Sequence, residues 1–201
     1  MFTPSNKGKL YPPEPLIRDE IQCLIRACSH RAPTGIRNRA LIVTMYRGGL
    51  RVSEALSLER KDLDPQSGSI RILHGKGDKA RTVGLDATAF DMIQRWLDIR
   101  SSLHISRGPL FCTLKGTRLS SAYVRKMLPR MALRAGIEKR VHAHGLRHTH
   151  AAELAAEGVP INVISRQLGH TNVGTTSRYI DHIAPQQVIE TMRMRQWSIS
   201  G

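Results

Sequence analysis

The sequence predicts a mainly α-helical domain with one small antiparallel β-sheet near residues 69–85. Three observations lead to this fold class. Through most of the chain, apolar residues recur at the three- and four-residue spacing of an amphipathic helix. Residues 69–85 change to two short runs on either side of a glycine-rich turn, a pattern typical of a hairpin. At 201 residues the chain fits one domain that is long enough to bury a core.

Three helices are expected before that sheet. The first two cover about residues 15–30 and 37–47, and a glycine pair supplies the C-terminal signal of the second. The third opens at Arg51, and Glu54 follows one turn later, so the two side chains can meet on one face. On these two residues alone, an ordinary surface ion pair is the simpler interpretation.

The hairpin and the element after it follow from turn and capping signals. Strands are predicted at residues 69–73 and 81–85. Asp86 is placed to cap a helix over about residues 87–103, whose large apolar residues belong to the core. The run at 109–112 has the character of a short buried strand or a turn.

A strongly basic helix is predicted next. Ser120 caps it, and Pro129 is expected to kink or break it before it resumes as far as Gly136. We interpret this segment as a helix along or in a DNA groove, held by phosphate contacts, with a solvated surface face as the alternative. The predicted contact residues are Arg118, Arg125, Lys126, Arg130 and Arg134.

The charge of the chain favours a polyanionic partner. Lys and Arg number 31 against 16 Asp and Glu, a net charge of +15 that is most often matched to nucleic acid. Aromatic residues make up only 4%, which argues against a platform that stacks single-stranded bases. No apolar run is long enough to span a membrane, and three cysteines without a CxxC pair indicate buried thiols. A cytoplasmic, nucleoid-associated protein without a membrane partner is therefore expected.

The stretch from His144 to Tyr179 holds the residues with the most distinctive chemistry. His144 and Arg147 share one face at the start of an apolar run. A proline and a glycine bound a short predicted helix over about residues 160–168, and His170 follows at once. Arginine binds phosphate oxygens with two parallel donors, histidine moves protons, and tyrosine can be a covalent nucleophile. The set is suited to attack on a phosphodiester.

This order of HxxR, LGH and Tyr resembles the tyrosine recombinase (phage integrase) family, in particular its Xer-like bacterial members. The resemblance predicts an upstream arginine in a context like GLRxSE, and Arg51 lies in Gly49-Leu50-Arg51-Val52-Ser53-Glu54. It also predicts a lysine in a β-hairpin, and Lys76 lies in the glycine-rich turn. The five motifs occur in the order of the family, over roughly residues 14–195, and imply the mainly helical catalytic-domain fold of DNA breaking-rejoining enzymes.

The resemblance implies a role for each matching residue. Tyr179 would attack a phosphodiester, form a 3′-phosphotyrosyl bond and release a 5′-hydroxyl. Arg51, Arg147 and His170 would hold the non-bridging oxygens. Because one phosphodiester is exchanged for another, no metal or other cofactor is expected. The remaining assignments are His144 for proton movement at the nucleophile, Lys76 as general acid, Glu54 as a supporting residue, and Lys79 and Arg81 as DNA-backbone contacts.

The resemblance also sets the expected domains and partners. Residues 14–201 are expected to be the catalytic domain, and residues 1–13, rich in proline, glycine and lysine, a flexible basic arm or linker remnant. The N-terminal core-binding domain of the family is expected to be absent. The partner is double-stranded DNA, on which a homo-oligomer, a tetramer, is expected. Residues 181–201 are expected to pack on a neighbouring protomer or on their own domain.

Three alternatives to a site-specific recombinase or integrase remain open. The same residues suit a tyrosine-type topoisomerase that relaxes DNA without strand exchange. A catalytically weak DNA-binding module is the second. The third is a zinc-dependent DNA-binding protein, because four histidines lie at 142, 144, 148 and 150, but no cysteine is near them in the sequence and only His144 matches the family. His148 is expected to pack or to donate to backbone.

Overall fold

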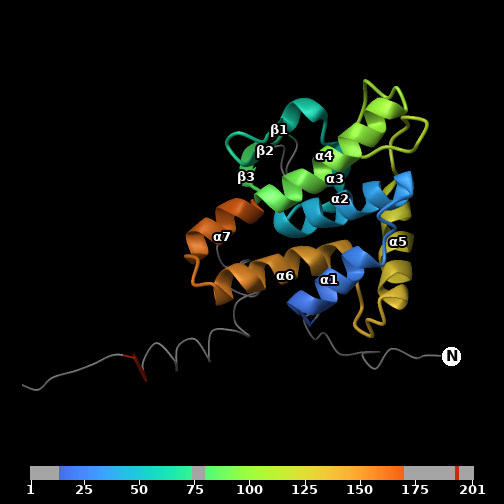
Figure 1. The fold of residues 1–201 in the computed structure, drawn as a ribbon. Coiled ribbons are helices and arrows are strands. Elements are labelled where there is room, and N and C mark those ends of the chain that lie inside the picture. The colour runs from blue at the N-terminus through green and yellow to red at the C-terminus, as the bar shows by residue number, and fades with distance from the viewer. Residues whose placement is uncertain (1–13, 74–79, 170–192, 195–201) are drawn as a thin grey trace, which may run out of the picture.

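The computed structural model describes residues 14–73, 80–169 and 193–194, and Figure 1 shows their arrangement. Helix α2 (Pro33–Arg47) lies at the centre, and ten of its fifteen residues are buried. It packs against α4 (Ala87–Ser102) and α6 (Ala143–Ala156). A helix enclosed on several sides is apolar around most of its circumference, as the run Ala40–Val43 shows.

The other elements surround this centre (Figure 1). Helices α1 and α5 contact each other near one end of α2, and α7 packs on both α6 and strand β3. The sheet is antiparallel in the order β1-β2-β3, with Ile70 opposite Val83, and both of these side chains are fully buried. The remaining bounds are α1 Arg18–Arg26, α3 Val52–Ser57, η1 Arg60–Asp62, β1 Leu63–Asp64, β2 Ser69–Ile72, β3 Arg81–Gly84, α5 Ser121–Arg134 and α7 Ile161–Leu168.

The predicted fold class is confirmed, and the differences are local. Helix α1 is shorter than the predicted 15–30, and α2 begins at Pro33 rather than at residue 37, with proline in the first turn, where its missing N–H costs nothing. Strand β1 was not predicted, because two residues are too few to show a strand period. Asp86 caps α4 as expected and accepts a hydrogen bond from the Ala89 N–H at 3.0 Å.

Of the kink or break expected at Pro129, the break is wrong, because α5 runs unbroken from Ser121 to Arg134. Pro129 lies on the exposed face of the helix. Its ring therefore projects toward solvent, and the carbonyl of Arg125, one turn earlier, loses its N–H partner on an exposed face, where water can replace it. Ser120 caps this helix as predicted, accepting from the Tyr123 N–H at 3.1 Å.

Two expectations about smaller features are settled as well. The run at 109–112 is not a strand: it is an irregular segment, buried from Leu110 to Cys112, with an isolated bridge from Cys112 to Arg118. Cys28 and Cys112 are buried thiols as expected, but Cys23 is exposed on α1. None of the helices in the described part of the chain is long and apolar enough to cross a membrane.

Arg100 holds the loop after α4 in place. The side chain is only 4% exposed, and its guanidinium donates to main-chain carbonyls rather than to a carboxylate. Trp96, one turn earlier, adds an indole hydrogen bond of 2.7 Å to the Leu110 carbonyl. The acceptors of Arg100 are the carbonyls of Ile105, Arg107, Pro109 and Leu110.

Arg100→Met should lower the free energy of unfolding by about 3 kcal/mol, because several buried carbonyls lose a charged donor. Urea denaturation followed by circular dichroism measures this. Arg95→Met, an exposed arginine of the same helix, is the control and should change stability by less than about 0.5 kcal/mol. Equal stability of the two variants would show that the carbonyl contacts contribute nothing.

Candidate active site

Arg147 connects two segments that are distant in the sequence. It lies in the second turn of α6 and is 3% exposed. One terminal nitrogen donates to the Gly49 carbonyl at 2.6 Å and the other to the Leu168 carbonyl at 2.5 Å. The guanidinium therefore links the turn that follows α2 to the C-terminal end of α7. This arrangement places a buried positive charge at the meeting point of three helices.

Gly49 permits this approach. Its φ is +59°, a left-handed conformation that favours glycine, and a Cβ there would lie 2.8 Å from Leu168 Cδ2 and 2.9 Å from His150 Cδ2. His150 is buried, and burial, followed by the charges of Arg47 and Arg147, lowers its pKa to about 4. It is therefore neutral at pH 7 and packs against the turn. His148 is also buried, in line with the packing role expected for it.

Arg51 reaches the same end of α7 from the start of α3. It is the N-cap residue of that helix, and its own N–H donates to Glu54 Oε2 at 2.9 Å. One terminal nitrogen donates to Glu54 Oε1 at 2.6 Å, and the other lies 3.5 Å from the Gly169 carbonyl. The side chain remains 27% exposed. Arg51 and Arg147 thus contact successive carbonyls, those of Gly169 and Leu168, at one point of the structure.

Glu54 is the carboxylate on which this cluster is built. Its side chain is 1% exposed, so the surface ion pair that two residues alone suggested is wrong. Arg81 binds both of its oxygens, with distances of 2.8 Å to Oε1 and 2.9 Å to Oε2. Burial by itself would raise the pKa of Glu54, but the hydrogen bonds and charges of Arg81 and Arg51 outweigh it and lower the pKa to about 2.

This shift predicts an acid-sensitive contribution to stability. Because the pKa in the folded state lies below the ordinary value of 4.5, Glu54 stabilises the fold above about pH 4.5, and the contribution is lost as pH falls toward 2. The loss should amount to about 3 kcal/mol. Urea denaturation at pH 6, 4.5 and 3 should show a flatter dependence for Glu54→Gln. Glu59→Gln, which removes an exposed partner of Lys61, is the control and should keep the wild-type dependence.

Arg81 points into the cluster and not toward solvent. It is 13% exposed and its guanidinium faces inward to Glu54. The signal that could have identified this was the strand period, because Arg81 lies two residues before the buried Val83 and shares its face. The structure therefore gives the Arg81 guanidinium a carboxylate partner, and the DNA-backbone contact predicted for it stays a prediction.

His144 is close enough to Arg51 and Arg147 to be affected by the charges of both. It is in the first turn of α6 and retains exposed surface. Partial desolvation by its surroundings, and then the charges of Arg147, His142 and Arg51, lower its pKa. The imidazole is consequently neutral near pH 7, the form that can accept a proton. Lys76, Lys79, His170 and Tyr179 lie outside the described residues.

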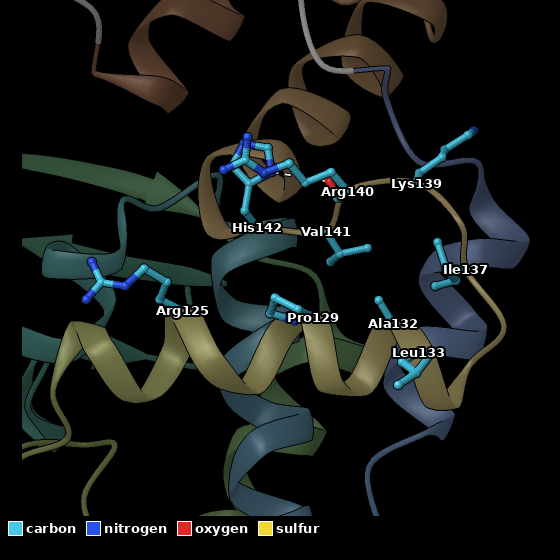
Figure 2. A pocket seen from close by; sticks show the side chains of 9 residues that line it. All are labelled: Arg125, Pro129, Ala132, Leu133, Ile137, Lys139, Arg140, Val141 and His142. Carbon is cyan, nitrogen blue, oxygen red and sulfur yellow. Dashed lines mark hydrogen bonds between the residues drawn. The ribbon is translucent and has the colours of Figure 1, made fainter. Parts of the chain in front are cut away.

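The predicted DNA-contact residues of the basic helix are all exposed, together with Arg118 before it. Arg125, Pro129 and Leu133 form one row on α5 and line a cavity of about 310 Å³. Figure 2 shows the loop that carries Arg140 and His142 across the cavity from α5. The cavity therefore lies between this row of α5 and the loop that leads into α6, the helix that carries His144 and Arg147.

The second row on α5 faces another direction. It consists of Lys126, Arg130 and Arg134, at intervals of four residues. Burial raises the pKa of the Cys28 thiol to about 11, and the charges of Arg39, Arg134 and Arg130 oppose that increase. Arg130 and Arg134 are therefore close enough to Cys28, which follows α1, for their charges to act on it. Across the described ranges, no three His, Cys, Asp or Glu side chains gather as candidate metal ligands.

Comparison with known sequences points to one family. Residues 15–185 match the phage integrase family model. The tyrosine recombinase XerD of Ralstonia nicotianae is 35% identical over 179 residues, which cover 88% of this chain and 58% of the relative. The tyrosine recombinase XerC of Halalkalibacterium halodurans is 34% identical over 198 residues, which cover 95% of this chain and 64% of the relative. The chain thus spans about three fifths of the length of these relatives.

Solved structures with similar folds agree with this. A crystal structure of XerA recombinase superposes with a TM-score of 0.81 at 29% identity, covering 98% of this chain and 71% of that one. The XerH recombinase bound to palindromic difH substrate in a post-cleavage complex has a TM-score of 0.76 at 31% identity, covering 96% and 55%. The catalytic domain of bacteriophage HP1 integrase has a TM-score of 0.64 at 28% identity, covering 92% and 96%.

Proposed function

The chain belongs to the phage integrase family, and from this premise we propose that it is a site-specific recombinase that cuts and rejoins double-stranded DNA through a 3′-phosphotyrosyl intermediate. The observation that carries the proposal is the convergence of Arg51 and Arg147 on the end of α7. The two residues are 96 positions apart in the sequence, yet both guanidiniums lie at one point.

The charge of this point suits a phosphodiester. Arg51 and Arg81 bind the carboxylate of Glu54, and Arg147 binds main-chain carbonyls beside them. Three guanidiniums and one carboxylate give the cluster a net charge of +2. A phosphodiester carries one negative charge, and a pentacoordinate phosphorus formed by anionic attack carries two. Donors that are already in place stabilise the developing charge without further reorganisation.

In the proposed reaction the hydroxyl oxygen of Tyr179 attacks phosphorus, and its proton passes to the neutral imidazole of His144. Arg51, Arg147 and His170 bind the non-bridging oxygens. The bond from phosphorus to the 5′-oxygen breaks, and Lys76 protonates that oxygen as general acid. Attack by a second 5′-hydroxyl on the phosphotyrosine then restores the tyrosine and exchanges the strands.

Residues 14–201 form the catalytic unit in this proposal, and the unit acts as a tetramer on DNA at the nucleoid. The exposed basic residues around α5 supply phosphate contacts: Arg118, Arg125, Lys126, Arg130 and Arg134. XerH, a site-specific recombinase, has been solved with its difH substrate before and after cleavage, which supports cleavage of a specific site by this fold.

Covalent attachment to DNA tests the proposal. The protein is incubated in EDTA with a pool of nicked duplexes of random sequence, in which the strand beyond the cut diffuses away and traps the intermediate. We expect an adduct with a free 5′-hydroxyl on the released strand, and peptide mapping should place the DNA on Tyr179. Sequencing the trapped DNA identifies the site. Attachment through the 5′ end, or cleavage only with added metal, would contradict the proposal.

A second assay separates strand exchange from relaxation. Duplexes that carry the identified site, one of them labelled, should yield joined products of new length. Relaxation of a supercoiled plasmid that lacks the site, without joined products, would instead indicate a tyrosine-type topoisomerase. DNA binding without any adduct would indicate a catalytically inactive binding module.

A further inference from the structure

Arg81 contacts both Glu54 and Gly169 within the cluster. It is the first residue of β3, and its two terminal nitrogens bind the two oxygens of Glu54. Its Nε is buried and makes no hydrogen bond to the described residues. Gly169, whose φ is +66°, lies directly against it, since a Cβ at Gly169 would be 2.6 Å from Arg81 Nε and 2.8 Å from Arg81 Cζ.

We infer that Arg81 is a positioning residue for DNA cleavage. It neutralises Glu54 and holds the carboxylate, so that Glu54 does not cancel the positive charge of Arg51 and one terminal nitrogen of Arg51 is kept for a phosphate. The inference rests on the proposed function. It replaces the DNA-backbone contact predicted from the sequence with an action through Glu54 and Arg51.

The first step of the argument is electrostatic. A carboxylate and a guanidinium that have no other charged partner form two parallel hydrogen bonds, and their charges cancel. At Glu54, Arg81 occupies that paired arrangement, so Arg51 is left with one terminal contact, to Oε1. The other terminal nitrogen of Arg51 has only the 3.5 Å approach to the Gly169 carbonyl. Without Arg81, Glu54 would draw both terminal nitrogens of Arg51 onto itself.

The second step concerns position. Gln167 on α7 binds Gly84, the last residue of β3, through both of its amide atoms: Oε1 accepts from the Gly84 N–H at 2.9 Å, and Nε2 donates to the Gly84 carbonyl at 2.8 Å. Arg81 packs on Gly169 at the opposite end of the strand. Strand β3 is thereby attached to the end of α7 at two points. Arg81 aligns this strand and helix with the carboxylate that orients Arg51.

This role and a phosphate contact have different consequences for binding. A positioning residue that is 13% exposed should affect the rate of the chemical step and leave DNA affinity alone. A phosphate contact should weaken binding at every sequence and lower the slope of log affinity against log salt by about one.

The experiment compares Arg81→Met, which keeps the length of the side chain, with Arg81→Lys and with Arg71→Met. Arg71 is an exposed arginine on the neighbouring strand β2 and serves as the control. Single-turnover cleavage at saturating DNA, DNA affinity at several salt concentrations, and melting temperature are measured for each. The substrate is the DNA recovered by trapping.

Arg81→Met should cut about 100-fold more slowly than wild type, with affinity within about twofold and an unchanged salt slope. Arg81→Lys, which restores the charge but not the paired geometry, should recover about a tenth of the lost rate. Arg71→Met should cut at the wild-type rate. Carbon NMR of Glu54 gives a readout without activity: its titration midpoint should rise in Arg81→Met.

Cleavage by Arg81→Met at the wild-type rate would overturn the inference. So would a weaker affinity with a reduced salt slope, which would make Arg81 a phosphate contact. A rate that falls only as far as the folded fraction falls, with no rescue by Arg81→Lys, would reduce the role to stability and also overturn it. Absence of an adduct from the wild-type protein contradicts the proposed function instead, so the two failures are distinguishable.

Discussion

Tyr179→Phe should abolish covalent attachment to DNA, lowering the single-turnover rate by at least about 10⁴-fold, because phenylalanine has no oxygen to attack phosphorus. DNA affinity should stay within about twofold, since the change removes one hydroxyl and no positive charge. Denaturing gels measure the adduct, and a mobility-shift assay measures binding at the same salt concentration.

Tyr123→Phe is the matched control. Tyr123 lies on α5, where its hydroxyl donates to Asn38 at 3.0 Å and accepts from Arg37. The loss of these contacts should lower stability slightly and leave the adduct unchanged. An adduct that persists in Tyr179→Phe, or one that disappears equally in both variants, would remove Tyr179 from the role of nucleophile.

Arg147→Met should have the second-largest effect, a loss of cleavage of about 10³-fold or more, together with a loss of stability. The buried carbonyls of Gly49 and Leu168 would both lose their donor, which should cost about 2–4 kcal/mol in the free energy of unfolding. Arg147→Lys restores the charge, but a single ammonium cannot reproduce the fork that spans the two carbonyls, so it should recover only part of either loss.

Single-turnover cleavage well below the melting temperature separates the two effects of Arg147, because the protein is then folded. Urea denaturation measures the loss in the free energy of unfolding. Arg166→Met, an exposed arginine on α7, is the control for removing one positive charge. Wild-type cleavage by folded Arg147→Met would show that the buried guanidinium is structural only.

Features set by near neighbours in the chain were predictable. The caps of α4 and α5 were located correctly because Asp86 and Ser120 each accept from an N–H three residues later. The start of α3 was also located correctly, since the N–H of Arg51 donates to Glu54 one turn on. Such bonds depend on residue type and spacing, which a sequence displays directly.

Features set by distant neighbours were not predictable in the same way. The burial of Glu54 was missed, because an arginine and a glutamate three residues apart look the same at a surface and in a core. Pro129 was expected to kink or break α5, but the helix continues through it, with the proline on the exposed face that tertiary packing leaves open to solvent. Arg81 was predicted to contact the DNA backbone, because nothing in the sequence indicates that Glu54, 27 residues away, binds it.

By itself, the sequence determined the helical class, the hairpin, and the set of arginines, histidines, lysine and tyrosine that marks the phage integrase family. Only the tertiary structure decided where Arg147 is held, between Gly49, 98 residues away, and Leu168, 21 residues away. The physical reason is that its acceptors are main-chain carbonyls. Every residue carries one, so no pattern of side chains can show which carbonyls the fold will bring to a guanidinium.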